Sequence, residues 1–210
     1  MKLETLQRHC LEFACADDQA DVAHGHDHLM RVLKNTIYLS ELEQANCQVT
    51  VPAACLHDCV AVPKDSPQRA RASRLAADRA TAFLATLPYP GDLLPEVFHA
   101  IEAHSFSAGI APRSVEARVV QDADRLDSLG AIGIARCLQL GVQLGRPLCA
   151  ADDPFCEARE PDDGRYTIDH FYAKLLKLPA TMQTAAGRAE AGRRAAAMQA
   201  WLDQLRSEIL

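Results

Sequence analysis

The sequence has little aromatic character and no long apolar run. Only 5% of its 210 residues are aromatic, with a single tryptophan, so a core must be built mainly from aliphatic side chains. No stretch approaches the roughly 20 apolar residues of a membrane-spanning helix, and the first residues carry no signal-peptide pattern. We therefore expect a cytoplasmic protein without a membrane partner.

Long basic runs are also missing. The chain carries 22 basic and 28 acidic side chains, which gives a formal net charge of −6. A protein dedicated to DNA or RNA usually carries a basic patch or stripe, so we expect no polymeric nucleic acid as the main partner. A small anionic substrate is compatible with this charge if positive side chains gather in one cleft.

The eight cysteines do not form a recognisable framework. None belongs to a C-x-x-C pair, and no histidine stands at zinc-finger spacing from them. This pattern argues against a structural zinc site and against the disulfide scaffold of a small secreted domain. We expect free thiols in a reducing compartment, packed as small apolar side chains.

Helical periodicity dominates the chain, and no segment shows clean strand alternation. Apolar residues recur at i, i+3 and i+4 after Asp27, which predicts a helix over about 27–43 with Asp27 as its N-cap. Pro52 fits the first turn of a short apolar helix over about 51–60. The sequence therefore predicts an all-α fold.

We expect one domain over residues 1–210. Its helical core spans about 20–145, and a helical extension occupies about 165–210. Glycines at 130 and 133 are expected to separate two helices within the core. The segment 145–165 is long for a loop, which makes it either a functional lid or a solvated excursion.

His57 and Asp58 interrupt an otherwise apolar segment. Burial of an imidazole beside a carboxylate is costly unless something compensates the charge, and a divalent cation would do so. Taken alone, such a pair is more often a hydrogen-bonded couple in the core. His28 adds weight, because it stands at the edge of the apolar face that begins at Leu29.

An acidic cluster, QDADRLD, spans residues 121–127. Asp122 and Asp124 lie about 160° apart around a helix, so the two carboxylates cannot easily serve one ion. Apolar residues lie on the Asp122 side of such a helix as well as on the Asp124 side. Periodicity therefore leaves open which aspartate points inward.

The order of these motifs resembles the HD superfamily of metal-dependent phosphohydrolases. His28 stands in HLMRV, His57 and Asp58 in ACLHDCVAVPKDSPQRA, His104 in IEAHSFS, and Asp124 in QDADRLDSLGAIGIAR. The segment DHFYAKLLKLPATMQT is similar to a C-terminal block in a subfamily of small bacterial predicted hydrolases. The resemblance covers roughly residues 20–195.

The resemblance implies a metal centre. Its ligands are His28, His57, Asp58 and Asp124, the last because the family's aspartate precedes Arg-Leu. Two imidazoles and two carboxylates suit Mn²⁺, Fe²⁺, Co²⁺, Ni²⁺ or Zn²⁺ better than Mg²⁺, which prefers oxygen. We expect one tightly held divalent ion, with a second ion held by the substrate as the alternative.

Proton transfer and phosphate binding need further side chains. Some HD enzymes carry an acidic residue three or four positions after the His-Asp pair, where this chain has Ala61 and Val62. His104 is the leading candidate for proton transfer, because an imidazole titrates near neutral pH. The further catalytic candidates are Lys64 and His24. Candidate cations for the phosphates are Lys64, Arg69, Arg125, Lys174 and Lys177, each of which is otherwise an ordinary solvated side chain.

Three functions of different classes follow. The first is a nucleotide hydrolase that cuts a nucleoside triphosphate to monophosphate and pyrophosphate, with a monophosphate phosphatase or cyclic-nucleotide phosphodiesterase as alternatives. The second is a non-catalytic nucleotide sensor on the same scaffold. The third is an interaction protein that binds through the Arg/Ala-rich tail, unless Met198, Leu202 and Leu205 dock on the body. We expect a small nucleotide partner and a monomer or homodimer.

Overall fold

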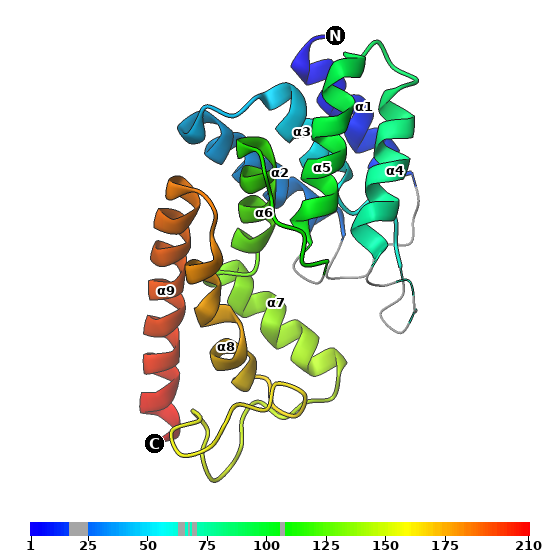
Figure 1. The fold of residues 1–210 in the computed structure, drawn as a ribbon. Helices are drawn as coiled ribbons and strands as arrows, with labels where there is room; N and C mark the ends of the chain where they lie inside the picture. Colours follow the sequence, from blue (N-terminus) through cyan, green and yellow to red (C-terminus); the bar gives the residue numbers. More distant parts are fainter. Residues whose placement is uncertain (17–24, 63–65, 67, 69–70, 106–107) are drawn as a thin grey trace. The chain divides into compact units, whose positions relative to one another are not determined.

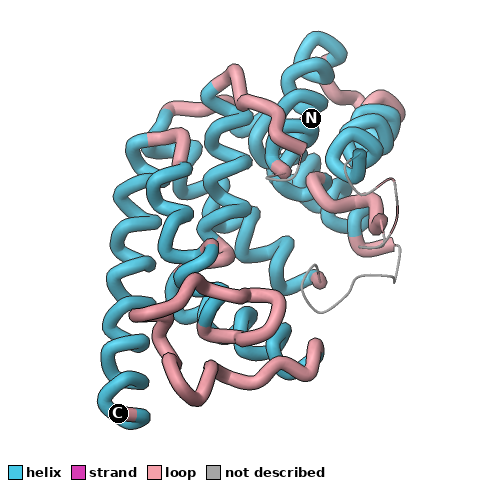
Figure 2. Tube along the Cα trace, turned by 60° about the horizontal axis from the view of Figure 1, so that its bottom comes forward, coloured by secondary structure: helices cyan, strands magenta, loops and turns pink. Residues whose placement is uncertain are grey.

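The described chain consists of helices and loops (Figure 2). The computed structural model describes residues 1–16, 25–62, 66, 68, 71–105 and 108–210, and these residues contain no strand. This confirms the all-α fold class. None of the described helices is long and apolar enough to cross a membrane.

The contacts of the chain group into two units, Met1–Asp124 and Arg125–Leu210. The predicted single domain with a core and an extension stays a prediction. The first unit contains α1 to α5 and most of α6, and α4 and α5 lie side by side within it (Figure 1). Its helices are α1 (Leu3–Ala14), α2 (His26–Glu43), α3 (Cys47–Leu56), α4 (Ala72–Leu84), the 3₁₀ turn η2 (Gly91–Leu93), α5 (Leu94–His104) and α6 (Val115–Leu126).

Helix α2 begins one residue earlier than predicted. Gly25 is its N-cap in an extended conformation, so the prediction that Asp27 caps the helix is wrong. Glycine is tolerated at this position, and the shift places Asp27 in the first turn, where a carboxylate favours the helix dipole. Of the predicted apolar stripe, Leu29, Val32, Leu33 and Thr36 are buried, whereas the prediction is wrong for Ile37, which is exposed. Gln44 ends the helix in the left-handed conformation.

Helix α3 spans Cys47–Leu56 rather than 51–60, because Asn46 caps it. The Asn46 side chain accepts a hydrogen bond from the Gln48 N–H at 2.9 Å. Pro52 therefore lies in the middle of the helix and not in its first turn. The N–H that proline lacks would have bonded the Gln48 carbonyl. Tyr89 Oη donates to that carbonyl at 2.8 Å, so a distant side chain completes the helix.

The second unit contains α7 (Gly130–Gln143), α8 (Asp169–Ala173), the 3₁₀ helix η3 (Leu175–Thr181) and α9 (Ala185–Ile209). The predicted break at the two glycines is confirmed. Gly130 has a φ of 70°, and a Cβ on Gly133 would lie 2.3 Å from the Ser128 carbonyl oxygen. Both positions therefore need glycine for α7 to start directly after α6.

The loop over 145–165 is tied down within this unit. The Asp153 carboxylate accepts the N–H groups of Glu157 and Ala158 at 2.9 and 2.8 Å. Arg159 donates to the buried carboxylate of Asp169 in α8 at 2.8 Å. These bonds hold the loop within the unit, although many of its residues are exposed to solvent.

Helix α9 uses its apolar residues within the same unit. Met198 and Leu202 are buried, and Trp201 stacks on Phe171 with ring centroids 5.5 Å apart. The tail thus docks on the body of the second unit through these residues. This arrangement counts against the tail as a free surface for a partner.

We expect Tyr89→Phe to lower the free energy of unfolding by about 1–2 kcal/mol, because the Gln48 carbonyl then loses its donor. In a Pro52→Ala background the N–H of the new alanine can bond that carbonyl. Tyr89→Phe should then lower the free energy of unfolding by less. Denaturant titration of the four proteins gives the coupling energy. Equal costs in both backgrounds would show that Tyr89 does not compensate for the proline.

Candidate metal centre

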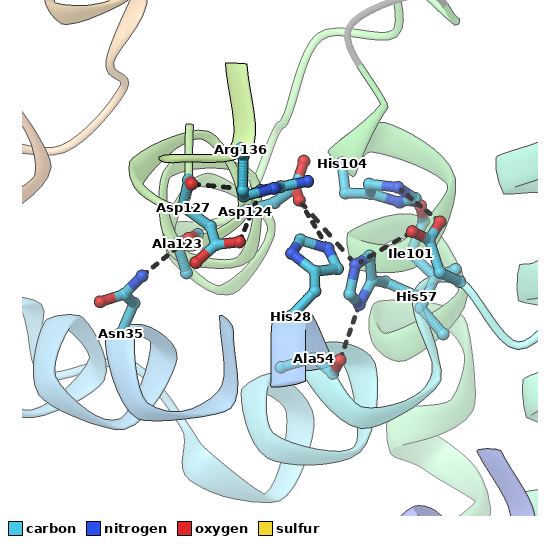
Figure 3. Close-up of polar contacts among 11 residues, drawn as sticks. His28, Asn35, Ala54, His57, Ile101, His104, Ala123, Asp124, Asp127 and Arg136 are labelled. Carbon is cyan, nitrogen blue, oxygen red and sulfur yellow. Dashed lines mark hydrogen bonds and ion pairs between the residues drawn. The ribbon is translucent and has the colours of Figure 1, made fainter. Parts of the chain in front are cut away.

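Three helices of the first unit bring His28, His57 and Asp124 together (Figure 3), and Asp58 lies beside His57. His28 lies in the first turn of α2, and His57 is the C-cap residue of α3. Asp58 follows His57 directly, and Asp124 lies near the end of α6. The two imidazoles are buried, whereas the carboxylates are more exposed. The nitrogen donors of the cluster are therefore buried, and its oxygen donors lie closer to solvent.

The separations between the donor atoms are those of a coordination site. One donor atom from each of His28, His57 and Asp58 lies within 4.8 Å of the other two. Asp124 Oδ1 lies 3.5 Å from His28 Nε2 and 3.9 Å from His57 Nε2. Donors about 2.1 Å from one tetrahedral ion lie about 3.4 Å apart, so the distances from Asp124 to the two imidazoles are compatible with one shared ion.

The orientation of His57 is fixed by the end of its own helix. Nδ1 donates a hydrogen bond to the Ala54 carbonyl at 2.7 Å, so Nε2 carries the lone pair and faces the cluster. That Nε2 is buried and has no hydrogen-bond partner among the described residues. Burial lowers the pKa of His57, which favours the neutral ring that binds metals. A buried polar atom without a partner is costly, and a divalent ion would satisfy it.

His104 stands on the Asp58 side of the cluster. It is the last residue of α5, and its Nδ1 donates to the Ile101 carbonyl at 2.6 Å. Its Nε2 lies 3.6 Å from Asp58 Oδ1, and its ring meets the His57 ring edge-on at 4.9 Å. Burial disfavours the charged ring, but the Asp58 carboxylate outweighs it, so the pKa of His104 is raised. The side chain is therefore aimed at the cluster by a backbone bond like that of His57.

The geometry distinguishes the two aspartates that periodicity left open. Asp122 is completely buried and takes part in an interaction of its own. Asp124 is the aspartate whose carboxylate lies beside the imidazoles of His28 and His57. The first unit therefore favours Asp124 as the ligand, in agreement with the resemblance.

The remaining predicted residues are not brought to the cluster by any described contact. His24, Lys64 and Arg69 lie outside the described residues. Arg125 donates to the Thr181 carbonyl at 2.6 Å within the second unit. Lys174 and Lys177 are exposed, beside and within η3 of the same unit. The roles of these six residues, including the part of Lys64 in catalysis, stay predictions.

The sequence did not reveal two features of the first unit. The first is Gln121, which donates to the Ala103 carbonyl at 2.6 Å while its own Oε1 is buried without a partner among the described residues. Its spacing of three residues from Asp124 was the available signal. The second is a cavity of about 370 Å³ lined by Arg71, Ser73, Arg74, Asp78, Glu102, Ala108 and Ile110.

The cavity contains two arginines that the sequence analysis did not single out. Arg71 and Arg74 stand at the start of α4, and Arg74 Nη1 lies 2.9 Å from Glu102 Oε1. The two acidic side chains in the lining balance the two arginines, so the cavity is not a strongly basic pocket. Their i, i+3 spacing at a helix start is a weak signal in a chain with many arginines.

Comparison with known proteins identifies relatives over most of the chain. Residues 25–129 match the HD domain family. The uncharacterized protein YpgQ of Bacillus subtilis strain 168 is 31% identical over 195 residues, which cover 90% of this chain and 87% of YpgQ.

Solved structures agree with this match. The crystal structure of an HD-superfamily hydrolase from Bacillus thuringiensis is 33% identical, with a TM-score of 0.73 and coverage of 98% of this chain and 95% of that one. The crystal structure of YpgQ in complex with ADP is 27% identical, also with a TM-score of 0.73, and covers 98% of this chain and 94% of that one.

We expect Asp124→Asn to remove most of the bound metal, because the substitution replaces a charged oxygen donor beside two imidazoles. Asp122→Asn is the matched control and should keep the metal while lowering the melting temperature, since Asp122 is completely buried and is not one of the proposed ligands. Elemental analysis of the purified variants measures metal per chain, and circular dichroism checks the fold. Metal retained in Asp124→Asn and lost in Asp122→Asn would reverse the assignment.

Proposed function

The chain belongs to the HD-domain family, and we propose that it is a metal-dependent hydrolase of phosphate ester or phosphoanhydride bonds in nucleotides. The observation that carries the proposal is the buried Nε2 of His57, which faces the carboxylates of Asp58 and Asp124 and has no hydrogen-bond partner among the described residues. Such an atom needs a compensating positive centre. His28, His57, Asp58 and Asp124 would hold it, and their mixed nitrogen and oxygen atoms favour Mn²⁺, Fe²⁺, Co²⁺, Ni²⁺ or Zn²⁺.

The chemistry requires a polarised phosphoryl group and an activated water. A bound divalent ion would supply both, because it withdraws charge from a phosphate oxygen and lowers the pKa of a water. The protein's contribution is orientation. The Ala54 carbonyl fixes the ring of His57, and the burial of both imidazoles keeps bulk water from the floor of the site.

His104 is the group we assign to proton transfer. Residues three and four positions after Asp58 are Ala61 and Val62, so no carboxyl group is available there. Nε2 of His104 lies 3.6 Å from Asp58 Oδ1, with Nδ1 held by the Ile101 carbonyl. At this atom a proton can be given to a leaving oxygen or taken from a water that also contacts Asp58.

A nucleotide is the substrate class that the relatives support. The structure of YpgQ, which covers nearly all of this chain, contains ADP. Within that class we favour a nucleoside triphosphate cut to a monophosphate and pyrophosphate. The polyphosphate would then be bound by five cationic side chains, those of Lys64, Arg69, Arg125, Lys174 and Lys177. A monophosphate phosphatase and a cyclic-nucleotide phosphodiesterase are the alternatives on the same site.

A non-catalytic nucleotide sensor is the second candidate function. The replacement of the acidic residue by Ala61 and Val62 favours it, because a sensor does not need a proton-transfer group. The presence of all four ligand residues favours the enzyme instead. Metal-dependent turnover separates the two candidates.

We expect the purified protein to contain a divalent metal and to hydrolyse a nucleotide with Mn²⁺, Co²⁺ or Ni²⁺ better than with Mg²⁺. A screen of nucleoside mono-, di- and triphosphates, with phosphate and pyrophosphate measured separately, identifies the bond that is cut. His57→Asn should lose the metal and lower kcat by about 1000-fold or more.

The fold of the His57→Asn protein is checked by circular dichroism, so that inactivity is not confused with misfolding. A folded His57→Asn protein with full activity would show that the site lies elsewhere. Bound nucleotide without turnover under every metal would favour the sensor.

We expect His104→Gln to keep the metal but to lower kcat by about 100-fold to 10,000-fold, because glutamine can hydrogen-bond but cannot transfer a proton. KM should change little if His104 acts only in the chemical step. Steady-state kinetics and elemental analysis of the same sample provide both readouts. Loss of the metal in His104→Gln would make His104 a ligand rather than a proton-transfer group.

A further inference from the structure

Helix α2 carries a second apolar face that the described residues leave exposed. Its buried face includes Val32, Leu33 and Leu39. The opposite side exposes four large apolar side chains: Met30 at 39%, Ile37 at 42%, Tyr38 at 49% and Leu42 at 55%. Single exposed apolar residues are ordinary, but four on one face of one helix mark an interaction surface.

The exposed face of α2 has a regular arrangement of charge. At 100° per residue, Lys34 and Glu41 fall on nearly the same line along the helix, with Ile37 and Tyr38 on either side of that line. Lys34 and Glu41 are both exposed. The midpoint between Lys34 and Glu41 coincides with the midpoint between Ile37 and Tyr38.

We propose that this face binds a second copy of the chain, with the two α2 helices antiparallel about a two-fold axis between Ile37 and Tyr38. In this register Lys34 of one copy lies opposite Glu41 of the other, and the reciprocal pair forms on the other side of the axis. Ile37 of each copy then packs against Tyr38 of the other. One surface therefore supplies both halves of a closed, symmetric interface.

The charge pattern favours a second copy over an unrelated partner. A foreign surface would have to present an acid and a base at a matching distance on either side of an apolar centre, whereas a second copy does so by symmetry. Two crossing helices bury less than the roughly 1,600 Å² of a standard interface, so the dimer dissociates readily. We expect a dissociation constant in the micromolar range or weaker.

The metal centre lies on the other side of α2. His28 belongs to the buried face, and neither Lys34 nor Glu41 contacts a proposed ligand. Dimerisation can therefore be removed without a change in the proposed chemistry. The inference stands apart from the proposed function.

Sedimentation equilibrium of the full chain, at concentrations up to about 0.5 mM, tests the proposal. Lys34→Glu and Glu41→Lys should each weaken dimerisation by about tenfold or more, because each places like charges opposite one another twice. A mixture of the two variants should dimerise again. The Lys34→Glu copy carries acidic side chains at positions 34 and 41, and the Glu41→Lys copy carries basic ones, so opposite charges face each other in the mixed dimer. The double variant should also dimerise.

Two charge reversals away from the face are the matched controls. Arg118→Glu on α6 and Glu12→Lys on α1 change exposed residues outside it and should leave the dissociation constant unchanged. Circular dichroism confirms that each variant is folded. A wild type that stays monomeric throughout, single variants that dimerise normally, or a mixture that does not recover would each overturn the proposal.

Discussion

The hydrogen bond from His57 Nδ1 to the Ala54 carbonyl is the interaction on which the candidate site depends. It turns Nε2 toward the other donors and leaves it without a partner among the described residues. The bond is possible because α3 ends at Leu56, so the carbonyl three residues before His57 is free to accept it. Helix α3 in turn packs against α1, α2, α4 and α5 and is buried from Val49 onward. The position of one imidazole thus rests on the packing of most of the first unit.

His104 is oriented by the same kind of hydrogen bond, because its Nδ1 donates to the carbonyl of Ile101, three residues earlier. Two helix ends therefore present two imidazoles with the same tautomer to the same carboxylate, Asp58. In the proposed enzyme the two rings differ in role, since one would be a ligand and the other would move a proton. The difference lies in their neighbours, because His57 also faces Asp124 across the cluster. A member of this family can therefore lack the acidic residue after the His-Asp pair and still have a titratable side chain, here His104, beside the aspartate of that pair.

Much of this arrangement could be predicted from the sequence, and the failures have local causes. Helical periodicity predicted the buried face of α2, and the apolar surroundings of His57 indicated an unusual site. The start of α3 was missed because Pro52 is a stronger start signal than the Asn46 cap. The choice between Asp122 and Asp124 could not be made from periodicity, since both flanks of α6 are apolar and only the position of His28 separates them. Gln121 was missed because a glutamine carries no signal of its own until its contacts are known.

Helix α3 has a consequence for the order in which the first unit can form. Its backbone bonding is completed by Tyr89, a side chain 41 residues away from Gln48, so local interactions alone do not finish the helix. Formation of α3 is thereby coupled to the arrival of the segment between α4 and α5, which makes this part of the chain cooperative. His57 and Asp58 follow the helix directly. A side chain far away in the sequence therefore supports the helix that presents two of the proposed ligands.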